Sequence, residues 1–186
     1  MRWSARSVVP RHSRSCLNAR NHDRPSWILF IGDSRLRQLY YSFTNQVSVE
    51  NYLGHKPDNR KYHSDLEFRD KELNLTVNFL WEPCINDSVV EHLRNLVNGK
   101  SYPNLLVLGA ATWSIKESNG SLASLDRYKL NVSKLTPSLS DLTRRIRVLW
   151  FLQPPVDEKK RATVYNVTAV TNDLIDMYND GAIQAL

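Results

Sequence analysis

Short apolar runs that alternate with stretches of helical periodicity constrain the fold more than any other feature of this 186-residue chain. The apolar runs cover residues 27–31, 73–81, 105–108 and 146–152. Runs of this length, rich in Leu, Ile, Val and aromatic residues, are typical of strands buried on both faces. Such strands, alternating with helices, form a parallel sheet with helices on both faces. The sequence therefore predicts an α/β fold with four strands.

The intervals between these runs carry helical periodicity, except for one polar segment. The predicted helices cover 34–47, 89–97, 122–145 with a break near Pro137, and 172–186. Asn98 and Gly99 end the second helix, and either Asp87 or Ser88 caps its start. Residues 48–72 are polar and rich in turn-forming residues, so we expect a long surface loop there.

An open α/β sheet of this kind ordinarily continues to at least one more strand. We therefore expect the domain to lack its last strand, and residues 146–152 to present an unpaired apolar edge. Such an edge predicts poor solubility for the 186-residue chain.

The net charge of +6 comes almost entirely from the N-terminus. Residues 1–26 contain six arginines and one acid, whereas residues 27–186 contain 19 basic and 18 acidic side chains. We expect two regions: a basic, disordered arm over 1–26 and a nearly neutral domain over 27–186. A basic groove for nucleic acid is not indicated.

The signals for cellular compartment conflict with one another. No apolar run approaches the roughly 18 to 20 residues of a membrane span, and no signal peptide is visible. The Arg- and Ser-rich start fits a mitochondrial presequence, although Pro10 and Pro25 would interrupt its helix. Five glycosylation sequons, against about two expected by chance, favour a lumenal or extracellular history. Their asparagines are Asn74, Asn86, Asn119, Asn131 and Asn166. Cys16 and Cys84 could form one disulfide or none.

The most specific local motif is Gly32-Asp33-Ser34, which ends the first apolar run and opens directly into the first helix. This junction would place the Ser34 hydroxyl at the carboxyl edge of the sheet, where ligands bind in open α/β folds. Backbone N–H groups at the start of the helix would lie beside it, ready to stabilise an oxyanion. Alternatively, Gly32 makes the turn, and Asp33 or Ser34 merely caps the helix.

Five segments together extend this motif into a resemblance over residues 27–186. They read FIGDSRLRQLYYSF, NFLWEP, LLVLGAATWSIKESNGS, YKLNVSKLTP and VLWFLQPPV, in this order. The chain resembles the lumenal catalytic domain of the sialate O-acetyltransferases, the capsule-synthesis-domain proteins of the Golgi. More broadly it resembles the SGNH/GDSL hydrolase superfamily, including plant polysaccharide O-acetyltransferases and PC-esterase domains. The resemblance implies a three-layer, flavodoxin-like sheet.

The resemblance also implies how Ser34 would act. Ser34 occupies the position of the nucleophile, which takes an acetyl group from acetyl-CoA and passes it to a hydroxyl of sialic acid or CMP-sialic acid; its N–H would help to form the oxyanion hole. Gly109, Ala111 and Thr112 lie in the segment that replaces the superfamily's Gly-x-Asn block. Ala111 stands where many relatives have an oxyanion-binding Asn, and Thr112 could donate through its hydroxyl or simply pack.

The resemblance further implies a base that this sequence does not contain. The family supplies a histidine and its orienting acid from an Asp-x-x-His motif downstream of the final helix, and none of the five histidines here follows an Asp at that spacing. We expect His55, His63 and His92 to be surface or partly packed residues. The catalytic His/Asp pair is therefore missing, which leaves the activity of the chain open.

Four further side chains could contact a substrate. Arg35 and Arg37 could meet an anionic sugar nucleotide or an acetyl-CoA phosphate, or be solvated helix residues. Trp81 and Trp113 could stack on a substrate ring or pack in the core. No Cys/His spacing indicates a metal site, and no Gly-rich phosphate loop is present.

Three functions remain open from the sequence: an incomplete O-acetyltransferase, a catalytically inactive glycan-binding relative, and an acetyl-ester hydrolase. The last differs from the first only in whether water or a sugar hydroxyl accepts the acyl group. The resemblance favours the Golgi lumen or membrane, in agreement with the lumenal history that the sequons favour. It also implies that full-length relatives carry a multi-pass membrane region.

Overall fold

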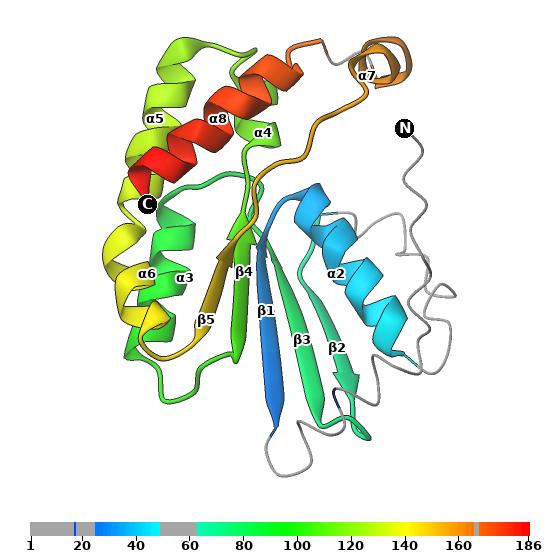
Figure 1. The fold of residues 1–186 in the computed structure, drawn as a ribbon, viewed down its shortest axis with the longest axis vertical. Helices are drawn as coiled ribbons and strands as arrows, with labels where there is room; N and C mark the ends of the chain where they lie inside the picture. Colours follow the sequence, from blue (N-terminus) through cyan, green and yellow to red (C-terminus); the bar gives the residue numbers. More distant parts are fainter. Residues whose placement is uncertain (1–16, 18–24, 49–62, 166–167) are drawn as a thin grey trace.

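A five-stranded mixed sheet forms the centre of the fold (Figure 1). The computed structural model describes residues 17, 25–48, 63–165 and 168–186. The strands are β1 (Ser26–Gly32), β2 (Leu66–Asp70), β3 (Leu75–Trp81), β4 (Leu105–Gly109) and β5 (Arg147–Trp150). Their order across the sheet is β2-β3-β1-β4-β5. Four of them are parallel, and β2 runs antiparallel to β3.

Strand β2 corrects two expectations from the sequence. It lies within the segment that we expected to be a loop, and it makes the sheet mixed rather than wholly parallel. Only Phe68 in β2 is fully buried, because one face of this edge strand is solvated, so the strand lacks a continuous apolar run. The first part of the expected loop, residues 49–62, lies outside the described residues.

Helices cover both faces of the sheet, which confirms the three-layer α/β architecture (Figure 1). The helices are α2 (Ser34–Val47), α3 (Asp87–Asn98), α4 (Thr112–Glu117), α5 (Leu122–Ser133), α6 (Thr136–Thr143), α7 (Glu158–Tyr165) and α8 (Asn172–Ala185). The expected break near Pro137 is confirmed, since α5 ends before this residue and Pro137 lies in the first turn of α6. Helices α4 and α7 were not predicted.

The cap of α3 differs from the prediction. Asn86, rather than Asp87 or Ser88, is the N-cap, and its Oδ1 accepts a hydrogen bond from Val89 N at 3.2 Å. Gly99 ends the helix, as expected, and its N–H donates to Leu96 O.

Successive side chains of the central strand β1 point to opposite faces of the sheet and pack into two separate cores. Phe30 packs with Tyr40 of α2 and Phe79 of β3 on one face. Ile31 points to the other face, where α3, α5, α6 and α8 close a larger core around residues such as Leu106. Helix α2 is therefore the cover of one face, and its start is fixed to the carboxyl end of β1.

The chain changes direction across the sheet between β1 and β4. After β1 it enters α2 on one face, and after β4 it enters α4 and α5 on the other (Figure 1). In open α/β sheets, ligands bind at such a switch point, outside the carboxyl ends of the strands. The fold thus brings Gly32-Asp33-Ser34 and the residues after Gly109 to one candidate site.

Candidate functional site

Two glycines allow the strand ends beneath the site to approach closely. Gly32 is paired with Gly109, and a Cβ on Gly32 would lie 2.3 Å from Gly109 O. A Cβ on Gly109 would lie 2.4 Å from Phe151 O. Real side chains never come this close, so the carboxyl ends of β1, β4 and β5 can meet only with glycine at both positions.

Asp33 is the residue that caps α2. Its Oδ1 accepts a hydrogen bond from Arg35 N at 2.9 Å, and the whole residue is buried, with 0% exposure. Burial raises the pKa of the Asp33 carboxyl, while the backbone N–H groups of Arg35, Leu36 and Ala111 and the charge of Arg35 oppose that rise. The capping alternative therefore holds for Asp33, and Ser34 is left without that task.

Ser34 is the first residue of α2 and is half-buried at the wall of a cavity of about 600 Å³. Among the described residues, no group hydrogen-bonds to its hydroxyl or accepts from its N–H. The first N–H groups of a helix have no partner within the helix and carry the positive end of its dipole. Ser34 thus presents a free hydroxyl next to a free N–H donor.

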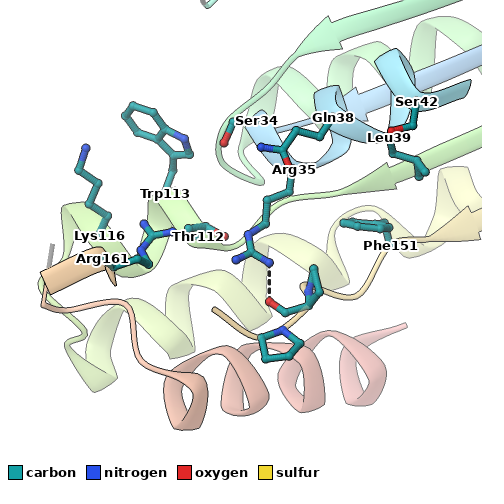
Figure 2. A pocket seen from close by; sticks show the side chains of 12 residues that line it. Ser34, Arg35, Gln38, Leu39, Ser42, Thr112, Trp113, Lys116, Phe151 and Arg161 are labelled. Carbon is teal, nitrogen blue, oxygen red and sulfur yellow. Dashed lines mark hydrogen bonds between the residues drawn. The ribbon is translucent and has the colours of Figure 1, made fainter. Parts of the chain in front are cut away.

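The cavity is lined from four parts of the chain: α2, α4, the segment after β5, and α7 (Figure 2). Three of the lining side chains are cations, namely Arg35, Lys116 and Arg161, and none of the twelve described lining residues is acidic. The lining residues are Ser34, Arg35, Gln38, Leu39, Ser42, Thr112, Trp113, Lys116, Phe151, Pro154, Pro155 and Arg161. The space beside Ser34 is therefore electropositive and suited to an anionic ligand.

Of the two arginines singled out in the first helix, only Arg35 lines this cavity. Its guanidinium is partly buried and donates to the carbonyl oxygen of Pro154 (Figure 2). Desolvation lowers the pKa of Arg35; the nearby Asp33 carboxylate opposes this effect, and Arg161 adds to it. Arg37 instead lies over the ring of Trp81, with its guanidinium carbon 5.2 Å from the ring centroid.

The segment after β4 contributes less to an oxyanion site than its sequence position implies. Ala111 is buried, and its N–H faces the Asp33 carboxyl. Thr112 lines the cavity, but its hydroxyl donates to Gln153 Oε1 at 3.0 Å. Gly109 serves the packing of the strand ends. No described group accepts a hydrogen bond from Ser34 N–H. This N–H is therefore the donor that remains free beside the Ser34 hydroxyl.

The two tryptophans have different surroundings. Trp113 lines the cavity, and Lys116 Nζ lies 4.7 Å from its ring centroid. Trp81 lies between Arg37 and His63, whose ring stacks on it at 4.6 Å between centroids. Trp113 also contacts His63 and Trp81, with ring centroids 5.3 and 6.0 Å away. The two tryptophans therefore differ in that Trp113 lines the cavity and Trp81 does not.

Neither described histidine hydrogen-bonds to Ser34. His63 contacts the rings of Trp81 and Trp113, and His92 Nε2 lies 3.1 Å from Glu82 Oε1. His12, His22 and His55 lie outside the described residues. The part of the chain that the structure describes thus shows no general base in contact with Ser34.

Sequence reasoning missed the segment that connects β5 to α7, which closes the cavity opposite α2. Two asparagines of α8 hold it by paired hydrogen bonds to its backbone. Asn179 accepts from Gln153 N at 2.8 Å and donates to Gln153 O at 2.9 Å. Asn172 accepts from Val156 N at 2.7 Å and donates to Val156 O at 3.2 Å. Their spacing of two helical turns places both on one face, and that spacing is the only sequence signal of this role.

The chain has sequence similarity to known proteins over most of its length. Over 165 residues, 88% of this chain, it is 38% identical to a protein of Danio rerio named N-acetylneuraminate (7)9-O-acetyltransferase. The chain is similar to a sialate O-acetyltransferase. Over 162 residues it is also 25% identical to Protein ALTERED XYLOGLUCAN 9 of Arabidopsis thaliana, covering 73% of this chain.

The chain spans only 20% of the length of the zebrafish protein and 42% of the Arabidopsis protein. No protein-family model matches the chain, and no solved structure does. The similarity to the zebrafish protein therefore concerns one region of a much longer protein.

The predicted modification sites are only partly accessible. Asn74, Asn86 and Asn119 are exposed, whereas the Asn131 side chain is half-buried and donates to Ile85 O at 2.9 Å. Asn166 lies outside the described residues. Cys84 forms no disulfide within the described part of the chain, and Cys16 lies outside it. None of the described helices is both long and apolar enough to cross a bilayer.

Proposed function

We propose that this chain is the acyl-transfer region of a sialate O-acetyltransferase, with Ser34 as the nucleophile. One observation carries the proposal: a serine with a free hydroxyl and a free N–H lies at the start of a long helix, on the wall of an electropositive cavity. The similarity to a protein named as a sialate acetyltransferase supports the nature of the acceptor. The exposed sequons Asn74, Asn86 and Asn119 favour a lumenal location, and the family resemblance favours the Golgi.

The proposed chemistry has two steps. Ser34 Oγ attacks the carbonyl carbon of a thioester such as acetyl-CoA, the C–S bond breaks, and the thiolate leaves. The negative charge on the carbonyl oxygen would be stabilised by Ser34 N–H and the positive end of α2. A sugar hydroxyl then attacks the acetyl-serine, and Ser34 recovers its proton.

Both steps need a base to take the proton from the attacking hydroxyl. We assign that role to a histidine oriented by a carboxylate, as in the Asp-x-x-His motif that the resemblance implies, because neither described histidine contacts Ser34. The proposed function therefore assigns the nucleophile and the anion-binding cavity to the described residues, and it assigns the base to no described residue.

The direct test is acetyl transfer from acetyl-CoA to N-acetylneuraminate and to its CMP ester by the 186-residue chain and two variants, with imidazole added as an external base. Ser34→Ala should reduce transfer to the uncatalysed background. Ser140→Ala, which alters an exposed serine on α6, should leave transfer unchanged. Transfer above the uncatalysed background that Ser34→Ala does not reduce would exclude Ser34 as the nucleophile.

A binding domain without turnover is the second candidate, because no described base contacts Ser34. In that case the chain would bind the sialate in equilibrium dialysis and show no transfer or ester hydrolysis above the Ser34→Ala level. Release of acetate without acetylated sugar would instead indicate the acetyl-ester hydrolase.

A further inference from the structure

Two arginines from distant parts of the sequence reach into the cavity from opposite sides. Arg35 comes from the first turn of α2, and Arg161 comes from α7 (Figure 2). Their like charges repel each other, and Arg161 adds to the lowering of the Arg35 pKa that desolvation causes. In Figure 2 the two guanidinium groups lie on either side of Thr112. Two like charges thus face the same space.

Neither guanidinium forms a salt bridge with a carboxylate in the described part of the chain. Arg35 donates to a neutral carbonyl, that of Pro154, and the nearby Asp33 carboxylate instead caps α2. Arg161 Nε is buried and has no hydrogen-bond partner among the described residues. A buried guanidinium donor without a partner is unfavourable, since guanidinium groups normally bind carboxylate, phosphate or carbonyl oxygens. The pair is therefore complementary to a ligand that supplies negative oxygens.

Helix α8 fixes the connection that precedes α7. The hydrogen bonds from Asn179 to Gln153 and from Asn172 to Val156 hold the chain on both sides of Pro154. Glu158, at the start of α7, accepts from Asn172 N at 2.6 Å. The same connection thus supplies the Pro154 carbonyl that holds Arg35 and leads into the helix that carries Arg161. A site fixed in advance in this way loses little entropy when a ligand binds.

We propose that Arg35 and Arg161 form a paired-guanidinium site for a phosphate group beside Ser34, and that Arg161 determines specificity for a phosphate-bearing ligand. A phosphate dianion would neutralise both guanidinium charges, whereas a carboxylate would leave one of them unpaired. Lys116 lines the same cavity and adds a third positive charge. This inference rests on the proposed function only for the identity of the ligand, because anion binding is measured without acetyl transfer.

The test is isothermal titration of the full chain with inorganic phosphate, coenzyme A and N-acetylneuraminate. Arg161→Gln should weaken phosphate and coenzyme A binding about tenfold or more, the effect of losing a charge-assisted contact. Arg144→Gln removes the same charge from the C-cap of α6, where the side chain is 73% exposed, and should change binding little. Arg161→Lys should restore only part of the affinity, because lysine lacks the planar fork.

Two further measurements separate the outcomes. Equal melting temperatures for Arg161→Gln and the unchanged chain would attribute the loss to binding rather than folding. A chain that binds phosphate through Arg161 but transfers no acetyl group, even with imidazole added, would refute the proposed function alone. Unchanged phosphate affinity in Arg161→Gln, or a loss confined to N-acetylneuraminate, would overturn the phosphate site.

Discussion

At the start of α2, Asp33 caps the helix and the neighbouring Ser34 lines the cavity. Asp33 is buried and caps α2 through its carboxylate, while the Ser34 hydroxyl faces the cavity without a described partner. The sequence could predict the turn and the position of Ser34, because Gly-Asp-Ser follows a buried strand. It could not predict which side chain would cap the helix, since Asp and Ser are both good caps.

Asp33 should make the stability of the protein depend on pH. Its pKa is raised by burial, so the folded state binds a proton more tightly than the unfolded state. As pH rises from about 4, the unfolded value, through the folded pKa, the unchanged chain should lose stability relative to Asp33→Asn. Urea unfolding at several pH values checks this prediction. A constant stability difference between the two proteins across that range would contradict it.

Any side chain at position 109 should lower the free energy of unfolding. Its Cβ would overlap Phe151 O at 2.4 Å, so Gly109→Ala should cost at least about 1–3 kcal/mol of unfolding free energy through overpacking. Gly99→Ala is the control, because the atom nearest to its Cβ, Asn95 O, would lie at 3.2 Å. Chemical denaturation measures both. A Gly109→Ala variant as stable as Gly99→Ala would show that the strand ends can separate at little cost.

At the scale of elements, the strands and helices with strong apolar patterns were predictable, and the weakly patterned ones were not. The run 27–31 became β1, and the helix expected at 34–47 became α2. Strand β2 was missed because Phe68 is its one buried residue, and α7 was missed because its polar sequence has no apolar stripe. Arg161 lies on α7, so one wall of the cavity could not be predicted from local pattern.

The pairing of α8 with the segment after β5 should hold the cavity together. Asn179→Ala removes both hydrogen bonds to the Gln153 backbone and leaves buried polar groups unpaired, at a cost of about 1–3 kcal/mol. The variant should also lose affinity for phosphate, since Arg35 and Arg161 depend on this segment.

The matched control for Asn179→Ala is Asn95→Ala, which alters an exposed residue of α3. Thermal unfolding and phosphate titration of both variants test the prediction. If Asn179→Ala matched Asn95→Ala in both measurements, the segment would be held by other contacts.

For the molecule as a whole, the sheet edge formed by β5 is the place where we expect association with other chains. Strand β5 lies at one edge of the described sheet, as the sequence predicted, and Leu149 on it is 48% exposed. An edge of unpaired backbone groups with apolar side chains invites pairing with another chain. The stability of the isolated chain is therefore tied to how this edge is covered.

The edge predicts concentration-dependent association of the isolated chain. Leu149→Lys should reduce it, because a lysine on an edge strand opposes pairing. Light scattering after size-exclusion chromatography measures the association, with Leu130→Lys as the control on an exposed residue of α5. A monomeric unchanged chain at high concentration, or equal effects of both lysines, would contradict the prediction.

The most direct test of the central claim is to trap an acetyl group on Ser34. The 186-residue chain is incubated with acetyl-CoA, with and without added imidazole as an external base, and is then analysed by intact mass and peptide mapping. A single acetyl adduct on Ser34 is expected, increased by imidazole and absent from Ser34→Ala. No adduct on Ser34 under either condition, or an adduct that persists in Ser34→Ala, would contradict this expectation.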